Sequence, residues 1–345
     1  MNRRFTSLLV LLGAAFSAAI SISAFDYEGH RVVNQLALSS LPADFPAFVR
    51  DAAARERIAF LSGEPDRWRN TPELALRHCN GPDHFFDLED LEWYDLTPAQ
   101  LTHFRYDFLA HMAVVRHRFP QRFPAIDPLK DSDHTKALPG FLPWTIAESF
   151  ARLKSAFSYL KEFEQGGTTE EIANAQANVI YLMGVMGHFA GDAAQPLHTT
   201  RHYNGWVGEN PRGYTTTNRF HSWIDGGYLQ KVGGVRAADL GSRMRPARVL
   251  GTNVFGDAMQ FILKQHQLVD PLYELEKRGG LTGEGEKGRE GIAFLSDRIV
   301  EAGQFLADLW LTAKVQAPPD NYLRSALARR KLNEAAPKVA PVPKP

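Results

Sequence analysis

Residues 179–192 read VIYLMGVMGHFAGD, and this stretch decides the fold class. Apolar side chains occupy nearly every position, so a helix formed here would be apolar on almost all of its faces. Such a helix belongs in the interior of a protein, with other helices packed around it. The stretch nevertheless contains two titratable groups, His188 and Asp192. Because a buried carboxylate costs several kcal/mol unless it is paired or bound to metal, Asp192 needs a compensating partner.

The rest of the chain shows the same preference for helix. Apolar residues recur at spacings of three and four, and long alternating runs of β-branched residues are missing. We therefore predict an all-α fold with few strands. Thr145 and Glu148 have the spacing of a capping box at the start of one helix. The expected helices cover residues 28–41, 44–61, 98–118, 145–163, 169–192, 220–229, 248–266, 291–314 and 320–335.

The composition allows a large core without cross-links. Hydrophobic residues make up 44% of the 345 residues and charged residues 23%. The single cysteine, Cys79, excludes an intramolecular disulfide and a zinc site built from paired cysteines, so metal ligands have to be His, Asp or Glu. Basic and acidic residues are equal at 39 each, which excludes a broad basic surface for nucleic acid. A phosphate substrate would therefore need positive charge from bound metal.

The two ends differ in composition from the region between them. Residues 1–24 contain two arginines, an apolar run too short to span a membrane, and then small residues, the pattern of a cleaved signal peptide. Cleavage after residue 24 would leave Phe25 as the N-terminus, and cleavage after residue 23 is the alternative. Residues 337–345 form a Pro-rich tail that we expect to be disordered. We thus predict a secreted or periplasmic protein with a single helical domain over residues 25–336.

Five potential metal ligands follow one another in the second half of the chain. His188 and Asp192 are four residues apart, as are His221 and Asp225, and this spacing puts both members of a pair on one face of a helix. His198 lies between the pairs in a Gln-Pro-Leu-His turn. A histidine bonded to its own i+4 aspartate explains one such pair without metal. Two pairs and the turn together favour a zinc or similar divalent site.

Three further candidates lie upstream: His30 in FDYEGH, Asp66 in GEPDRWRN and His84 in NGPDHFFDLED. Each alone is more often a capping or hydrogen-bonding residue than a ligand. Together with the five downstream ligands, they follow one another in the order GH, an Asp before a basic residue, HF.D, GHF.GD..QPLH and H...D. This order resembles the superfamily of single-strand-specific zinc nucleases and bacterial zinc-dependent phospholipases C. The resemblance extends over essentially all of the chain after the signal peptide.

The resemblance implies a multi-helical domain around a cleft with three Zn²⁺ per chain. In such a cluster Asp192 bridges two of the ions, and a hydroxide between them attacks phosphorus in line. The implied ligands are Asp66, His84, His188 and Asp192 for the first ion, His30 with the α-amino group and carbonyl of Phe25 for the second, and His198, His221 and Asp225 for the third.

The spacing of the last ligands favours the nuclease branch. The resemblance implies that phospholipase members have Glu as the last ligand. It also implies a shorter interval between the ligands that match His198 and His221. This chain has Asp225 and a long loop, although the loop reads NGWVGENPRG instead of the Gly-Gly-Asn common in the family. Phe25 also stands where the family usually has Trp. The nuclease branch implies cleavage of single-stranded DNA and RNA together with 3′-nucleotidase activity.

Residues beside the ligands are the candidates for catalysis and substrate binding. Arg69 stands where the nucleases carry a basic residue that stabilises the transition state, so the resemblance implies a catalytic set of Asp66, Arg69 and Asp192. Phe85 and Asp87 match positions that stack a base and bond its edge. Without that role, Phe85 would be a core residue and Arg69 a surface charge.

Two other functions stay open at this point. One is a phospholipase C acting on phosphatidylcholine-like headgroups, and the other is a relative that binds metal without catalysis. The chain has no HExxH or GxSxG motif, which makes a metalloprotease or a serine hydrolase a poor fit. The expected partners are single-stranded nucleic acid or nucleotides, with phospholipid headgroups as the alternative, and no obligate protein partner is predicted.

Overall fold

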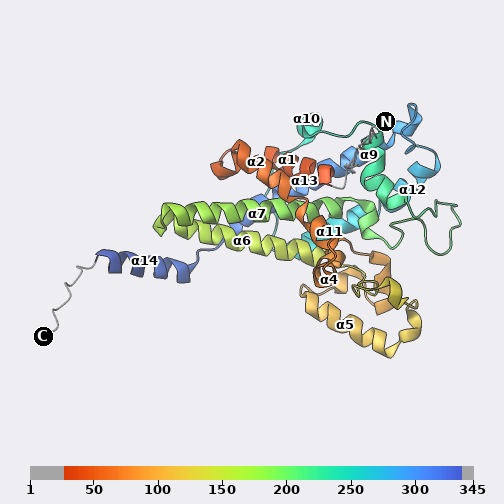
Figure 1. Ribbon diagram of the computed structural model, residues 1–345, viewed down its shortest axis with the longest axis horizontal. Coiled ribbons are helices and arrows are strands. Elements are labelled where there is room, and N and C mark those ends of the chain that lie inside the picture. Colours follow the sequence, from red (N-terminus) through yellow and green to blue (C-terminus); the bar gives the residue numbers. More distant parts are fainter. Residues whose placement is uncertain (1–26, 336–345) are drawn as a thin grey trace, which may run out of the picture.

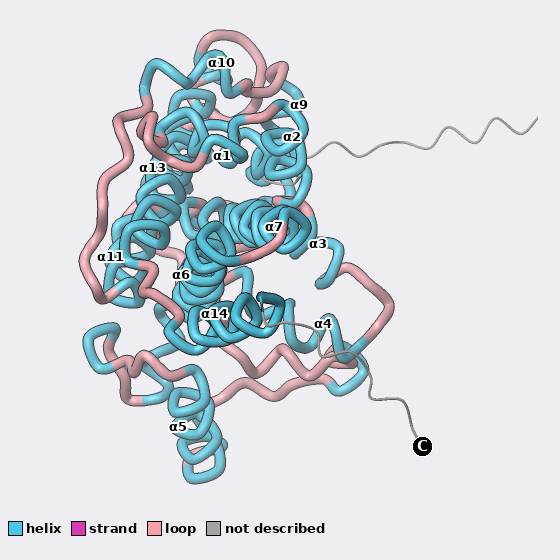
Figure 2. Tube along the Cα trace, turned by 90° about the vertical axis from the view of Figure 1, so that its left-hand side faces the viewer, coloured by secondary structure: helices cyan, strands magenta, loops and turns pink. Residues whose placement is uncertain are grey.

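The apolar stretch 179–192 forms part of the central helix of the molecule. The computed structural model describes residues 27–335, and in it α7 (Thr169–Ala194) passes through the middle of the molecule (Figure 1). Every residue from Met183 to Ala194 is buried. Figure 2 looks along α7 and shows the other long helices arranged around it. A helix with apolar residues on all faces can be covered only in this way.

The described residues are helical throughout, apart from loops and one isolated β-bridge between Phe86 and Gly140. None of their helices is both long and apolar enough to span a membrane. The α-helices are α1 (Tyr27–Ser40), α2 (Ala52–Leu61), α3 (Glu64–Arg69), α4 (Leu74–Asn80), α5 (Arg105–Arg118), α6 (Leu142–Gly166), α7, α8 (Phe220–Ser222), α9 (Tyr228–Lys231), α10 (Ala237–Leu240), α11 (Val254–His266), α12 (Val269–Lys277), α13 (Gly291–Gln316) and α14 (Asn321–Ala335).

Short helical turns connect several of these helices. Trp223–Gly227 (η8) is a π-helical turn between α8 and α9. The 3₁₀ turns are η1 (Ala47–Arg50), η2 (Gly81–His84), η3 (Leu88–Tyr94), η4 (Pro98–Gln100), η5 (Pro120–Arg122), η6 (Pro128–Lys130), η7 (Pro196–Thr199), η9 (Gly241–Arg243) and η10 (Lys287–Arg289).

The all-α prediction is thus confirmed, while several helix boundaries differ from those expected. The expected helix 44–61 is divided at Asp51, whose extended backbone (φ −60°, ψ 145°) separates η1 from α2. The expected helix 98–118 is likewise interrupted between η4 and α5. The predicted signal peptide, Phe25 and the Pro-rich tail lie outside the described residues.

The predicted capping box of Thr145 and Glu148 is wrong. Helix α6 begins at Leu142, because Pro143 in its first turn already has the backbone angle of a helix and needs no amide donor. Glu148 instead accepts two hydrogen bonds of 3.0 Å from Arg105. A capping box does form at the next helix, where Thr168 Oγ1 accepts from the amide of Glu171 and the Glu171 carboxylate accepts from the amide of Thr168.

Glycines on α7 allow α1 and α2 to approach it closely. A Cβ at Gly184 would lie 2.5 Å from Leu61 Cβ on α2, and a Cβ at Gly187 would overlap the Asn34 side chain of α1. Asn34 uses this closeness, since its Nδ2 donates to the carbonyls of Ile58 (2.8 Å) and Gly184 (3.0 Å). One buried amide therefore joins α1, α2 and α7.

We expect Gly187→Ala to lower the free energy of unfolding by about 1–3 kcal/mol, because the added methyl group has to displace Asn34 from its two carbonyl acceptors. Urea unfolding measures the change. Gly241→Ala is the matched control, since Gly241 has a helical backbone and open space around its missing Cβ. Equal losses in the two variants would show that close helix packing is not the cause.

Residues 95–140 form an arm outside the bundle. Helix α5 lies apart from the long helices at the lower edge of Figure 1 and also projects from them in Figure 2. The chain then returns to α4, where Asp133 and Arg77 form an ion pair of 2.7 Å. The bridge between Phe86 and Gly140 closes the arm beside the end of η2. The arm therefore lies next to the predicted site.

Candidate metal centre

The predicted ligands within the described residues meet at the C-terminal end of α7. They come from six separate segments, which the packing of α1 and α3 against α7 brings together. Their positions are His30 on α1, Asp66 on α3, His84 at the end of η2, His188 and Asp192 on α7, His198 in η7, and His221 and Asp225 in the segment from α8 to η8.

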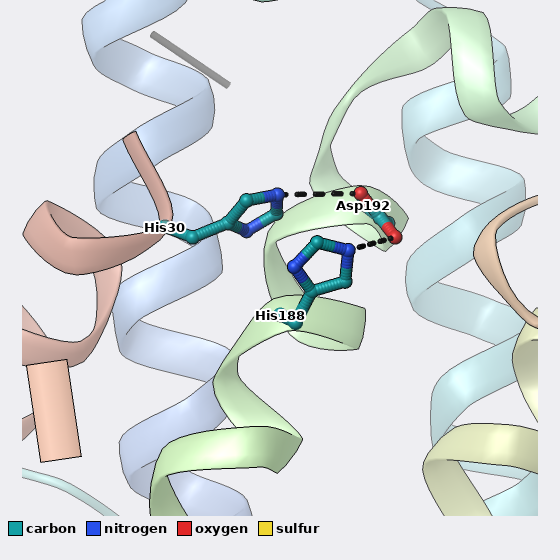
Figure 3. A group of neighbouring side chains, drawn as sticks. All are labelled: His30, His188 and Asp192. Carbon is teal, nitrogen blue, oxygen red and sulfur yellow. Dashed lines mark ion pairs between the residues drawn. The ribbon is translucent and has the colours of Figure 1, made fainter. Parts of the chain in front are cut away.

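These side chains form three groups that could each hold a metal ion. Within each group the candidate ligand atoms lie no more than 4.8 Å apart. Figure 3 shows the first group, with His30 reaching from α1 towards Asp192 and with His188 one turn before Asp192 on α7. The groups are His30, His188 and Asp192; Asp66, His84 and His188; and His198, His221 and Asp225.

Asp192 is the hub of the centre. Its Oδ2 lies 3.0 Å from His84 Nδ1 and 3.3 Å from His188 Nε2. Its Oδ1 lies 3.5 Å from His30 Nε2 and 3.3 Å from His198 Nδ1. The side chain is only 3% exposed, so these imidazoles are its compensation in the described structure. Both carboxylate oxygens thus face different imidazoles, the arrangement that a bridging carboxylate requires.

Two of the imidazoles are oriented by backbone carbonyls. His188 Nδ1 donates to the carbonyl of Ser62 (2.8 Å), and His198 Nδ1 donates to the carbonyl of His84 (2.8 Å). With Nδ1 carrying the proton, Nε2 of each ring keeps its lone pair for the centre. Histidines that bind metals are typically held in this way by a hydrogen bond from the other ring nitrogen.

The third group is built around a π-helical turn. His221 Nε2 lies 3.0 Å from His198 Nε2 and 3.1 Å from Asp225 Oδ2. Two ring nitrogens this close need a metal ion or a single proton between them. Gln195 Nε2 donates to the other Asp225 oxygen (2.8 Å) and fixes the carboxylate. The turn Trp223–Gly227 contains Asp225, and π-helical turns are frequent at functional sites.

The electrostatics leave most of the centre ready to bind a cation. Burial and the neighbouring His188 lower the pKa of His30 to about 3, and burial and Arg69 lower the pKa of His84 to about 4. Both rings are therefore neutral at pH 7, as metal ligands must be. Burial opposes the charge of Asp192, but His188 and His198 prevail and hold its pKa well below the usual range.

His198 behaves differently because two carboxylates flank it. Burial lowers its pKa, but Asp192 and Asp225 outweigh burial and raise it to about 9. The two carboxylates thus favour positive charge at His198, and a divalent ion bound at Nε2 would provide that charge in place of a second proton.

A cavity of about 360 Å³ opens beside the centre. This volume is within the range of about 300–1,000 Å³ that is usual for small-molecule sites. Arg69, Phe85 and Asp87 line it together with His84, His198 and His221. Nε of Arg69 lies 2.7 Å from Asp66 Oδ1, so the carboxylate positions the guanidinium.

Asp87 in the cavity wall has a buried side-chain oxygen that lacks a partner among the described residues. Its amide donates to the carbonyl of Pro139 (2.7 Å), and the unpartnered oxygen is Oδ1. Burial, with Asp90 and Glu89 nearby, raises its pKa well above the usual value. A ligand that offers a hydrogen-bonding group at this position would satisfy the side chain.

Asp90, next to this wall, provides a test of the electrostatics. Burial raises its pKa to about 6, with Arg201 opposing the shift and Glu89 adding to it. The folded state therefore binds more protons than the unfolded state between about pH 4 and pH 6, and stability is lost as the pH rises through this window. We expect Asp90→Asn to raise the free energy of unfolding by about 1–2 kcal/mol at pH 8 and not at pH 4.

Urea unfolding of Asp90→Asn at the two pH values measures this difference. Asp95→Asn is the matched control, because Asp95 is 63% exposed at the end of the same 3₁₀ turn. A gain of equal size at pH 4 and pH 8 would mean that the ionisation of Asp90 has no part in it.

Several residues of the site were not anticipated from the sequence. Gln195 is fully buried, and besides Asp225 it binds the amide of Leu197 through Oε1 (2.7 Å). Arg77, Lys136 and Tyr203 line the cavity. Gln195 had one sequence signal, its place in the Gln-Pro-Leu-His turn. Nothing in the spacing of Arg77, Lys136 and Tyr203 indicates a site.

Comparison with models of known protein families gives no match for this chain, and a search of curated proteins gives none either. The structure therefore establishes an all-α protein with three groups of His and Asp side chains that could hold metal ions. Phe25, the remaining predicted ligand, lies outside the described residues.

Proposed function

We propose that the protein is a zinc-dependent phosphodiesterase that cleaves single-stranded DNA and RNA and removes the 3′-phosphate of nucleotides. The observation that carries this proposal is the connection of the three His and Asp groups. His188 belongs to two of them, and Asp192 contacts histidines of all three. Such a connected donor set is suited to ions that act together on one phosphate.

The donor set fits zinc, because it consists of imidazole nitrogens and carboxylate oxygens only. His30 and Asp192 would hold one ion together with the backbone of Phe25. Asp66, His84 and His188 would hold a second ion, which would share Asp192 with the first. His198, His221 and Asp225 would hold the third. When bound, zinc supplies positive charge for the phosphate and activates water at neutral pH.

The chain's own residues would complete the site on the cavity side. Arg69, held by Asp66, offers a guanidinium to the charge that develops on phosphate. Phe85 is half-buried on the cavity wall and offers a ring on which a base can stack. Asp87 offers its unpartnered oxygen to the edge of that base. These roles support nucleic acid as the substrate.

The test compares three substrates under one set of conditions. The zinc-loaded protein is assayed on single-stranded DNA, on adenosine 3′-monophosphate and on a choline phospholipid, and its zinc content is measured. We expect activity on the first two. Activity on the lipid alone would establish a phospholipase C instead. Full zinc content without turnover of any of the three would establish a metal-binding relative without catalysis.

The proposed ligand role of Phe25 makes a separate prediction. If its α-amino group binds zinc, residues left ahead of Phe25 remove that ligand by converting the amine into an amide. We expect such a form to carry one zinc ion fewer and to lose activity by roughly tenfold or more. Metal analysis and a nuclease assay measure both. The control carries the same extra residues after Pro345, and full zinc content in the N-terminally extended form would refute the role of Phe25.

A further inference from the structure

The cavity beside the metal centre is also lined by two cations that the proposed catalytic and base-binding roles do not use. Arg77 on α4 and Lys136 in the arm line the same 360 Å³ cavity as Arg69 and Phe85. Arg69 pairs with Asp66 of the metal centre. Arg77 lies on α4 and pairs with Asp133, and Lys136 lies in the loop 131–138. The cavity is thus positively charged at two separate places.

The loop 131–138 is fastened to α4 through Asp133. The Asp133 carboxylate accepts from Arg77 Nη2 (2.7 Å) and from Thr135 Oγ1 (2.9 Å), and its carbonyl lies 2.7 Å from His78 Nδ1. His134 next to it has a positive φ of 55°, which costs about 1 kcal/mol in a residue other than glycine. The two bonds from α4 to Asp133, directly before this strained residue, and the bond from Thr135 back to Asp133 keep the loop in one conformation.

Lys136 is held by its backbone and not by its side chain. Its amide donates to Asp131 Oδ1 (3.0 Å), while the side chain is exposed and forms no ion pair within residues 27–335. Arg77 is paired, but the ion pair engages Nη2, and a guanidinium has five N–H donors. On this part of the cavity wall, Arg77 and Lys136 carry two positive charges against one negative charge on Asp133, because Asp131, which accepts from the Lys136 amide, does not line the cavity.

We propose that Arg77 and Lys136 bind a second phosphate of the substrate, on the far side of the base from the metal centre. This inference rests on the proposed function. With one phosphate at the metal ions and the base against Phe85, the next phosphate of a nucleotide strand comes to the wall formed by α4 and the loop 131–138. The site therefore prefers nucleotides phosphorylated on both sides of the sugar to nucleoside 3′-monophosphates.

The test measures kcat/KM for adenosine 3′-monophosphate and adenosine 3′,5′-bisphosphate. Water releases the 3′-phosphate from both, leaving adenosine or adenosine 5′-monophosphate. We expect the zinc-loaded wild-type protein to favour the bisphosphate. Lys136→Gln is expected to lower kcat/KM for the bisphosphate about tenfold, the value of one charge-assisted hydrogen bond, and to leave the monophosphate unchanged.

Lys130→Gln is the matched control, because Lys130 is 82% exposed in the same arm and does not line the cavity. Arg77→Gln is a second variant with the same expected selectivity, but it also removes the anchor of Asp133. Lys136→Gln keeps that anchor, so a folding defect in the arginine variant does not weaken the test.

An unchanged ratio of the two kcat/KM values in Lys136→Gln, with the monophosphate still hydrolysed, would overturn the second phosphate site and leave the proposed function standing. Hydrolysis of neither nucleotide by the zinc-loaded wild-type protein would overturn the second phosphate site, and it would overturn the proposed function as well if single-stranded DNA is not cleaved either.

Discussion

Asp192→Asn is expected to lower the rate of phosphodiester hydrolysis by about 1,000-fold. The change keeps the shape of the side chain and removes its charge. Among the described residues, Asp192 is the one carboxylate that contacts histidines of all three groups, so on the proposed function the two ions that would share it lose a negative ligand. A metal ion contributes several kcal/mol to the stabilisation of charge in the transition state, and about 4 kcal/mol corresponds to the expected factor.

If the proposed three-zinc centre is correct, the zinc content of the variant should fall from three ions to one. The group of His198, His221 and Asp225 does not depend on Asp192 as a ligand and keeps its own carboxylate. Its Asp225 is fixed by Gln195 and not by Asp192. Loss of two ions with retention of the third would therefore distinguish a bridging role from general damage to the fold.

Metal analysis and a nuclease assay of the folded variant test both expectations. Asp257→Asn is the matched control. Asp257 lies on helix α11, is half-buried, and its Oδ2 has no hydrogen-bond partner among the described residues. It belongs to none of the three groups. It should keep its zinc and its activity. Three zinc ions and an undiminished rate in Asp192→Asn would rule out the bridge.

The central helix and its two ligands could be predicted because their signals are local. The apolar run decides that α7 is buried, and the four-residue spacing decides that His188 and Asp192 share a face. The convergence of His30, Asp66 and His84 on this helix is different, because spacing along the chain says nothing about it. It was expected only through the resemblance to a family, and the geometry now shows these side chains at one place.

The supports of the centre had no sequence signal. Ser62 orients His188 through its backbone carbonyl, an atom that every residue possesses. Gln195 acts through a side chain whose type is common in turns. The π-helical turn at Asp225 adds one residue to a helical turn without a change in composition that would reveal it.

The short helices were missed for a related reason. Helices α3 and α4 have 6 and 7 residues, too few for a periodic pattern to emerge from a window of about 11–18 residues. They nevertheless place Asp66 at the metal centre and Arg77 on the cavity wall. The arm that carries Lys136 is likewise irregular, so the composition of the cavity wall emerges only from the three-dimensional arrangement.

Removal of zinc by a chelator is expected to lower the melting temperature by about 20 °C and to abolish activity. At free zinc about 1,000 times its dissociation constant, each proposed site would stabilise the folded state by about 4 kcal/mol, or about 12 kcal/mol for three sites. A domain of this size gains roughly 2 °C per kcal/mol. Without the ions, Asp192 and Asp225 stay buried and only histidines and one glutamine compensate them.

The metal-free protein should also become less stable in acid. The pKa values of His30 and His84 lie at about 3 and 4 in the folded state and near 6.5 when unfolded, so the unfolded state binds more protons in this window. Stability is therefore lost as the pH falls from about 6.5 towards 3. His198, with its pKa raised to about 9, has the opposite effect and loses its contribution as the pH rises through 9.

Calorimetry of the zinc-loaded and the chelated protein at about pH 7.5, 5.5 and 4 tests these predicted changes in stability. The chelated protein should melt at a lower temperature at each step towards acid, and added zinc should restore the melting temperature at pH 7.5. Because protons and zinc compete for the same nitrogen atoms, the gain from zinc should shrink as the pH falls. A melting temperature that is indifferent to both chelator and zinc would mean that the three groups pair with one another and hold no metal.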